Sequence, residues 1–387
     1  MNFVNIFAEL QEVTYEPRIP VELESYTAGD LLAGNLKSKG AFLLDCNGNK
    51  FAVSQWLSPK RTRTFPYARV YDTLRMKNRV TLIPFCKDEG ADGDRDFLQW
   101  DTVSLMSVLN VYVIPCYYVE AEKTTRPGQT RKNKITKQVM DYQHVHKKIC
   151  ELSNYHSSAL HWNLLQMDQL SEIARLTLDS YRNIARRTGV RLHGEGGIKK
   201  RIQIIADDVA KFKQLSRALA ENAQNRERLT DQPKEKTVAR KATVTMKNLI
   251  GGLYNWTADE CTVVSGHVFL IEKKHSRNKW LPSRIDIKDA FIKSALFCNI
   301  KTLMINGKRM PHRTAVGLTS DVVRGSLHSA MSDAEINQFL ADNNAGAADR
   351  TFISEIVAEA DKNGFGLFIV NASDANADQY GLLKKLL

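Results

Sequence analysis

The chain has 387 residues, of which 43% are hydrophobic and 25% are charged. This composition excludes the fibrous and intrinsically disordered classes, and the length predicts two or three globular domains. The 55 Lys and Arg residues outnumber the 43 Asp and Glu residues, which gives a formal net charge of +12. Such a surface suits a polyanionic partner, although solubility alone is an equally good explanation.

Membrane segments and disulfides are not expected. No stretch approaches the roughly 18 consecutive apolar residues of a membrane-spanning helix. The first residues, MNFVNIFAELQEVTYEP, lack the basic and apolar regions of a signal peptide. Six cysteines lie far apart without a CxxC pair, which is typical of reduced thiols rather than of a disulfide framework or a zinc ribbon. We therefore expect no membrane partner and a cytoplasmic location.

Residues 1–142 predict an α/β domain with a possible role in DNA recognition. The stretch GAFLLDCNGNKFAVSQWL alternates around an Asn47-Gly48 turn, and VTLIPF and VYVIPCYYV have the apolar character of buried strands. A basic loop follows at 123–137 and contains Lys132 and Lys134. This loop either orders on DNA or is simply solvated.

The spacing of apolar residues predicts a helical segment at 143–225, and the polar stretch 226–236 is typical of a linker. Within the helical segment, HGEGGIKKR places Lys199, Lys200 and Arg201 at a helix start, where they would contact a DNA phosphate or solvate the helix. The pattern His144-x-His146-x-x-x-Cys150 suggests metal ligands only weakly. Residues two apart on a helix do not share a face, so we interpret these as ordinary helix residues.

Residues 237–387 predict a second α/β domain. NWTADECTVV and HVFLIEKKHS predict two strands joined at Ser265-Gly266. A helix is predicted over RIDIKDAFIKSALFCNI, followed by the strand KTLMI. Two further helices, the first opening with a Ser332–Glu335 capping box, precede a last strand GLFIVN. This order predicts a mixed sheet with helices packed on it.

The Ser265-Gly266 turn fixes the register of its hairpin. If Val264 pairs with His267, Asp259 lies opposite Glu272. Two carboxylates about 5 Å apart repel by roughly 3 kcal/mol at an effective dielectric of about 20. A divalent cation such as Mg²⁺ between them reverses the sign of this interaction. Strand alternation returns Lys274 to the same face and points Lys273 away.

This arrangement suits hydrolysis of a phosphodiester bond. Asp259 and Glu272 would hold the metal, which lowers the pKa of a bound water, and Lys274 would orient or deprotonate that water. In the alternative interpretation Asp259 belongs to a turn and the Glu-Lys-Lys run is a solvated strand end. A second acidic set, Asp94, Asp96 and Asp101 with 120–123, forms either a degenerate site of the same kind or a helix cap and a solvated strand end.

The hairpin residues resemble the PD-(D/E)XK nuclease superfamily, whose αβββαβ core carries an Asp on one strand and (Asp/Glu)-x-Lys on the next. Asp259, Glu272 and Lys274 match this pattern, although Ala258 stands where Pro is usual. Residues 270–300 resemble more narrowly the type II restriction endonuclease-like proteins, through Leu-Pro-Ser at 281–283 and Ile-Lys-Asp at 287–289.

The resemblance implies a Mg²⁺-dependent endonuclease that cuts double-stranded DNA sequence-specifically, as a homodimer with a companion DNA methyltransferase in restriction-modification. Lys279 would add a DNA contact beside the site. Two other functions stay open. One is an antiphage defence effector that degrades DNA without sequence choice after activation, and the other is a nucleic-acid-binding protein without catalysis.

Overall fold

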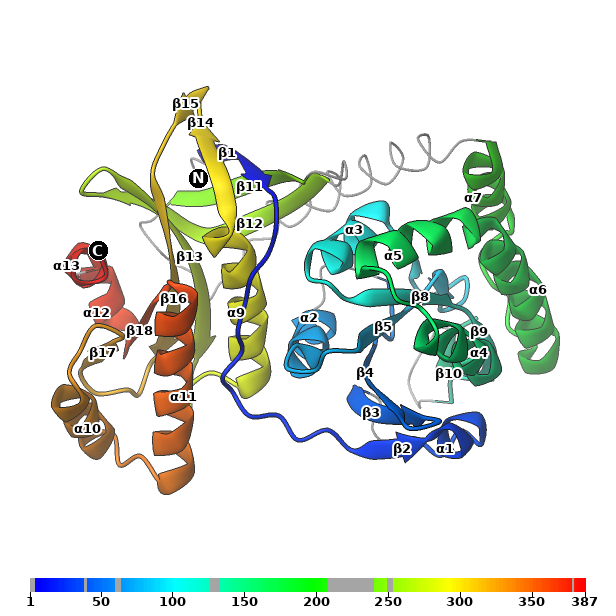
Figure 1. The fold of residues 1–387 in the computed structure, drawn as a ribbon, viewed down its shortest axis with the longest axis horizontal. Helices are drawn as coiled ribbons and strands as arrows, with labels where there is room; N and C mark the ends of the chain where they lie inside the picture. Colours follow the sequence, from blue (N-terminus) through cyan, green and yellow to red (C-terminus); the bar gives the residue numbers. More distant parts are fainter. Residues whose placement is uncertain are drawn as a thin grey trace. The chain divides into compact units, whose positions relative to one another are not determined.

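A computed structural model describes residues 4–37, 40–59, 64–125, 133–207, 240–248, 253–377 and 379–387. The fold is mixed α/β and divides into two compact units. We call Glu22–Ala220 the middle unit, and Met1–Val21 together with Glu221–Leu387 the terminal unit. Each unit has its own sheet (Figure 1).

The middle unit contains a five-stranded sheet in the order β2-β3-β4-β5-β8. The predicted Asn47-Gly48 turn is present, since both residues have positive φ, 57° and 84°. Two further strand pairs, β6 with β7 and β9 with β10, complete the strands described in this unit. The strands are β2 (Ser25–Thr27), β3 (Ala41–Cys46), β4 (Asn49–Gln55), β5 (Arg79–Pro84), β6 (Cys86–Asp88), β7 (Arg95–Phe97), β8 (Tyr112–Cys116), β9 (Tyr118–Lys123) and β10 (Ile135–Met140).

The helices of the middle unit pack on these strands. The predicted helical segment corresponds to α4–α7, and α4, α5 and α6 contact β3, β8 and β9 respectively. The segment therefore shares one compact unit with the first α/β region rather than standing apart from it. The predicted linker 226–236 lies outside the described residues. The helices are α1 (Ala28–Leu32), α2 (Thr64–Thr73), α3 (Trp100–Val108), α4 (Tyr142–Ser153), α5 (Ala159–Asp168), α6 (Leu170–Thr188) and α7 (Gly196–Asp207).

The terminal unit contains a nine-stranded sheet in the order β15-β14-β1-β11-β12-β13-β16-β18-β17. Neighbours β11, β12 and β13 are antiparallel, whereas β16 runs parallel to β13 and β18 parallel to β16. The strands are β1 (Val4–Leu10), β11 (Arg240–Asn248), β12 (Leu253–Val264), β13 (His267–Ser276), β14 (Ile300–Ile305), β15 (Lys308–Arg309), β16 (His312–Ser320), β17 (Ser326–His328) and β18 (Gly366–Asn371).

Helix α9 (Arg284–Cys298) lies along this sheet and contacts β13 and β16 (Figure 1). It begins after Ser283, whose hydroxyl accepts from the backbone amide of Asp286. Helix α10 (Asp333–Asp342) opens with the predicted Ser332–Glu335 capping box. The other helices are α11 (Ala347–Asn363), α12 (Ala372–Ala377) and α13 (Gln379–Lys385).

The beginning of the chain belongs to the terminal unit, which corrects the predicted 1–142 boundary. Strand β1 pairs with β11 on one side and β14 on the other. The buried carboxylate of Glu359 on α11 then accepts from the backbone amides of Arg18 and Ile19, at 2.7 and 3.0 Å, and from the Tyr15 hydroxyl at 2.5 Å. These contacts span more than 300 residues, so local sequence patterns do not reveal them.

Of the helices in the described ranges, none combines the length and apolar character that a bilayer crossing requires. All six cysteines carry free thiols, as the sequence predicted.

Replacing Glu359 by Ala should destabilise the terminal unit by about 2–4 kcal/mol, because the buried Ile19 amide and the part-buried Arg18 amide would lose their acceptor. Glu359→Gln retains a carbonyl acceptor for these amides and should lose less. Denaturant unfolding of the full chain, with limited proteolysis near residues 11–21, measures both effects. Equal stability of the wild-type protein and Glu359→Ala would contradict this account of the N-terminal segment.

Candidate functional site

The hairpin that carries the candidate site has the predicted register. Val264 pairs with His267, and the ladder continues to Glu260 opposite Ile271. Ser265 and Gly266 both have positive φ, 49° and 82°, as a two-residue type I′ turn requires. The paired ladder ends there, one step before the predicted pair of Asp259 and Glu272.

Strand β12 is irregular where Asp259 lies. Its register against β11 shifts between the pairs Arg240 with Cys261 and Ala242 with Ala258, which is the mark of a β-bulge. The half-buried Asp259 carboxylate accepts from the backbone amide of Lys273 at 2.9 Å. A bulge changes the direction of the side chains at its position. This bulge lies at Asp259, directly after the last β12–β13 pair, Glu260 with Ile271.

Glu272 is the centre of a buried ionic cluster. Its side chain is 1% exposed, and its two oxygens accept separately from Lys274 Nζ and Lys293 Nζ, both at 2.9 Å. Lys274 Nζ also donates to Asp289 Oδ2 at 2.9 Å. Lys293 Nζ donates to the Thr257 carbonyl at 3.2 Å. A carboxylate from the middle of a sheet is thereby joined to a helix through two lysines.

Helix α9 supplies the two members of the cluster that sequence analysis missed. Asp289 and Lys293 are four residues apart, so they share one face of α9. Most of their neighbours on the helix are buried and apolar, among them Ile287, Ala290 and Phe291. Two charged residues four apart within such an apolar helix were the sequence signal that could have identified them as site residues. The rotation of α9 against β13, which brings them to Glu272, has no local sequence signature.

The charges of the cluster set the protonation of its members. Burial opposes ionisation of Glu272, but the Lys274 and Lys293 ammoniums outweigh it and lower the pKa of Glu272. Burial acts against the Lys274 ammonium, yet Glu272, Asp289 and Asp259 raise the pKa of Lys274 well above its usual value. Lys274 is therefore protonated within this cluster. A protonated lysine can orient a water by donating to it but cannot accept a proton from it.

The donor set fits a hard divalent cation. Asp259, Glu272 and Asp289 offer carboxylate oxygens, the ligands that Mg²⁺ prefers. Three carboxylates against the ammoniums of Lys274 and Lys293 leave a formal charge of −1. These carboxylates do not form a group of three within 4.8 Å, and both Glu272 oxygens hold ammoniums. A metal bound to Glu272 would therefore share an oxygen with an ammonium or replace it.

The opposite face of the hairpin behaves as predicted. Lys273 points away from the cluster and its Nζ lies 2.5 Å from Glu260 Oε2. His275, whose role the sequence left open, lies with Nδ1 3.1 Å from Thr319 Oγ1 on β16. The side chains of both residues therefore contact other strand residues, Glu260 and Thr319, on the face away from Glu272.

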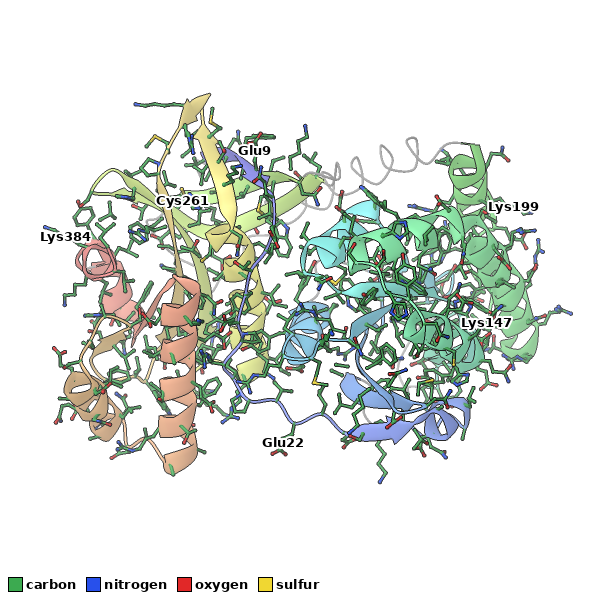
Figure 2. All side chains as sticks on the ribbon, in the orientation of Figure 1. Glu9, Glu22, Lys147, Lys199, Cys261 and Lys384 are labelled. Carbon is green, nitrogen blue, oxygen red and sulfur yellow. The ribbon has the colours of Figure 1, made fainter. Side chains whose placement is uncertain are left out.

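Of the three predicted DNA contacts on α7, two are exposed and one is buried. Lys199 and Lys200 are exposed on α7, where Figure 2 labels Lys199, but Lys199 pairs with Glu195 at 2.7 Å. The Arg201 guanidinium is buried 4.0 Å from the Phe97 ring centroid, and burial lowers its pKa to about 10. Arg201 is thus a packing residue, contrary to its predicted phosphate contact.

The remaining basic candidates are Lys134, Lys132 and Lys279. Lys134 pairs with Glu89 at 3.1 Å, and Lys132 lies outside the described residues. Lys279 lines a cavity of about 770 Å³ in the terminal unit, together with Arg284 and Arg324. Of the predicted DNA contacts, Lys279 is the one that follows directly on the strand of the Glu272 cluster.

The second acidic set forms no comparable cluster. Asp96 accepts from Ser58 Oγ at 3.1 Å, Asp101 is buried in the first turn of α3, and Glu122 pairs with Lys137 at 2.9 Å. Within the described part of the chain, only Cys46, His146 and Cys150 bring three potential metal-ligating atoms within 4.8 Å of one another.

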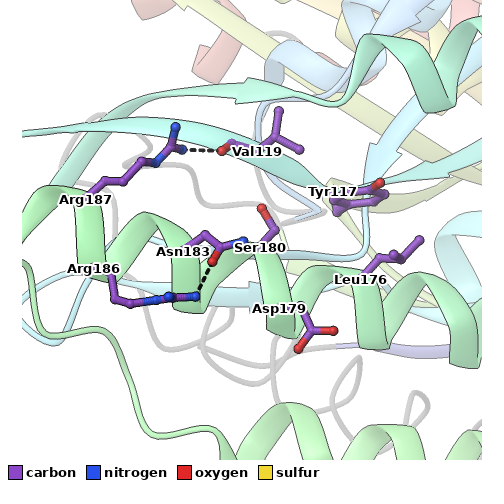
Figure 3. Close-up of a pocket in the computed structure, with 8 residues that line it drawn as sticks. All are labelled: Tyr117, Val119, Leu176, Asp179, Ser180, Asn183, Arg186 and Arg187. Atoms are coloured by element: carbon purple, nitrogen blue, oxygen red, sulfur yellow. Dashed lines mark hydrogen bonds between the residues drawn. The ribbon is translucent and has the colours of Figure 1, made fainter.

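A separate cavity of about 520 Å³ lies between α6 and β9 (Figure 3). Arg187 donates to the Val119 carbonyl and Arg186 to Asn183 Oδ1, so both guanidiniums are held at its wall. None of the sequence-predicted site residues lines it.

No family model, curated protein or solved structure matches the chain.

Lys293→Met should destabilise the terminal unit by up to about 3 kcal/mol, because a buried carboxylate loses one of its two cations. The double variant Glu272→Gln/Lys293→Met should lose less than the sum of the single variants, with a coupling of about 1–3 kcal/mol. Denaturant unfolding measures this cycle, with the exposed Lys308→Met as a control expected to change stability by less than about 0.5 kcal/mol. Additive losses would mean that Glu272 and Lys293 do not interact.

The lowered pKa of Glu272 predicts a pH dependence of stability. A carboxyl group whose folded-state pKa is depressed stabilises the fold above its unfolded-state pKa and loses this contribution as pH falls through the folded-state pKa. The difference in unfolding free energy between the wild-type protein and Glu272→Gln should therefore shrink as pH falls below the ordinary carboxyl range. A difference that stays constant over this acidic range would contradict the charge assignment.

Proposed function

We propose that this protein is a Mg²⁺-dependent endonuclease that hydrolyses phosphodiester bonds in double-stranded DNA. One observation carries the proposal: at the end of a central strand, buried Glu272 lies one step beyond the last pair of the β12–β13 ladder, with Lys274 two residues further in direct contact and the Asp259 carboxylate bonded to the intervening Lys273 amide. A solvated strand end would leave these side chains in water, whereas here Glu272 and Lys274 are largely buried.

The topology around the hairpin supports the same proposal. The antiparallel strands β11, β12 and β13 are followed by α9 and then by β16 parallel to β13. This sequence of elements agrees with the strand, helix and strand part of the αβββαβ core that the hairpin motif suggests. Strands β14 and β15, inserted after α9, extend the sheet on its other side next to β1. We therefore propose a PD-(D/E)XK core, with β1 as an added strand.

The residues would divide the work as follows. Asp259 and Glu272 would hold the metal, which when bound supplies an acidified water and offsets the charge that builds on the phosphate. Lys274, tied to Asp289, would donate to the attacking water or to the phosphate oxygen. Lys293 is a positioning residue, because it touches Glu272 and the Thr257 carbonyl and holds the carboxylate ionised.

Double-stranded DNA is the proposed substrate because the chain carries a net charge of +12, and because Lys279, Arg284 and Arg324 line the cavity after β13. Sequence-specific cutting by a homodimer, with a companion methyltransferase that protects host DNA, extends this proposal. Symmetric cutting of both strands needs two such sites. Indiscriminate degradation by an activated defence effector uses the same chemistry and differs in the products.

The test is digestion of unmethylated plasmid and phage DNA with and without Mg²⁺. Glu272→Gln and Lys274→Met should each lower the cleavage rate by at least about 100-fold, the scale of losing one group that stabilises a transition state. The exposed Lys308→Ala should cut like the wild-type protein. Calorimetric titration of Mg²⁺ measures the metal site without DNA and should show weaker binding for Glu272→Gln.

The products decide between the alternatives. Discrete fragments indicate sequence-specific cutting, and a smear indicates an effector nuclease. Calorimetric Mg²⁺ binding unaffected by Glu272→Gln would remove the proposed metal site. DNA binding without cleavage, in protein that also takes up no Mg²⁺, would show a non-catalytic binding protein and contradict the proposal.

A further inference from the structure

Two thiols and an imidazole meet in the middle unit, in a place unrelated to the Glu272 cluster. Cys46 Sγ lies 3.4 Å from Cys150 Sγ, and Cys150 Sγ lies 3.6 Å from His146 Nε2. All three atoms lie within 4.8 Å of one another. Cys46 is buried, while His146 and Cys150 are half-buried.

The elements of the middle unit bring these residues together from distant positions. Cys46 is the last residue of β3, directly before the tight Asn47-Gly48 turn. His146 and Cys150 are four residues apart on α4, so they share the helix face that packs against β3. His144 does not join them, because its Nε2 lies 3.0 Å from the Pro115 carbonyl. His144 and His146 thus have different partners, as their spacing predicted, but the local pattern gave no sign of Cys46.

The distances are those of a tetrahedral zinc site. With Zn–S bonds of about 2.3 Å and Zn–N bonds of about 2.0–2.1 Å, tetrahedral angles place two sulfurs about 3.8 Å apart and a sulfur and a nitrogen about 3.5 Å apart. The two atom pairs above lie within a few tenths of an ångström of these values. A disulfide would join only the two sulfurs, at about 2.05 Å. It would leave the position of His146 beside them unexplained.

We propose that Cys46, His146 and Cys150 bind a Zn²⁺-class cation, with a fourth position open to water or to an added ligand. Sulfur and imidazole ligands suit this class of metal and do not suit Mg²⁺. The half-exposed helix side of the cluster gives the ion its access. Such a site would join the end of β3 to α4, across 104 residues of sequence, and would stabilise the middle unit.

The test uses Co²⁺ as a spectroscopic probe on the reduced, chelator-treated full-length protein. We expect a thiolate-to-cobalt charge-transfer band in the near ultraviolet and the visible bands of tetrahedral Co²⁺, both abolished by added Zn²⁺. Co²⁺ bound by carboxylates at the Glu272 cluster would give no thiolate band, so the two sites are distinguished. Zn²⁺ should also raise the melting temperature of the wild-type protein.

Variants assign the ligands. Cys150→Ser and His146→Gln should each weaken Co²⁺ binding by at least about 100-fold. Replacing a residue that only hydrogen-bonds to a metal ligand weakens binding less, by about 10–100-fold. Cys298→Ser, in the terminal unit, is the matched control and should bind Co²⁺ like the wild-type protein. Circular dichroism establishes that each variant is folded.

Three results would overturn the proposal. The first is the absence of a thiolate band in the reduced wild-type protein. The second is an undiminished band in folded Cys150→Ser and His146→Gln. The third is a protein that takes up no Co²⁺ but readily forms a disulfide between Cys46 and Cys150 on mild oxidation, which would make the pair a redox couple instead.

Discussion

The candidate site depends on one buried charge, the carboxylate of Glu272 in the middle of the nine-stranded sheet. An ionised group in such surroundings costs several kcal/mol unless it is well paired. Lys274 from the same strand and Lys293 from α9 each occupy one of its oxygens. This pairing holds only if α9 keeps its rotation and height against β13. The ionic cluster therefore links the docking of the helix to the geometry of the site.

The parts of the site that depend on short-range geometry could be predicted from sequence. A two-residue turn with positive φ at Ser265 and Gly266 determines which residues face each other, and alternation determines that Lys274 joins Glu272 while Lys273 does not. Lys293 and Asp289 could not be found in this way. Their contacts depend on how a helix rotates over a sheet, which many side chains decide together.

Long-range pairings explain the other differences between sequence and structure. Strand β1 lies between β11 and β14, whose residues follow it by more than 200 positions. Cys46 and Cys150 are 104 positions apart, so the helix pattern around Cys150 showed two potential ligands and not the third. Arg201 was predicted to contact phosphate because it lies in a basic run at a helix start, yet its guanidinium is buried against Phe97. In each case the packing of separate elements, not local propensity, decided the outcome.

The arrangement of the two lysines bears on how a metal would enter the proposed active site. Each ammonium has a second partner, Asp289 for Lys274 and the Thr257 carbonyl for Lys293. Either lysine can therefore release its Glu272 oxygen and remain hydrogen-bonded, which lowers the cost of replacing an ammonium by a divalent cation. If Lys274 is the one released, Asp289 still tethers it beside Glu272. The lysines would then hold Glu272 ionised without the metal and yield to it when it binds.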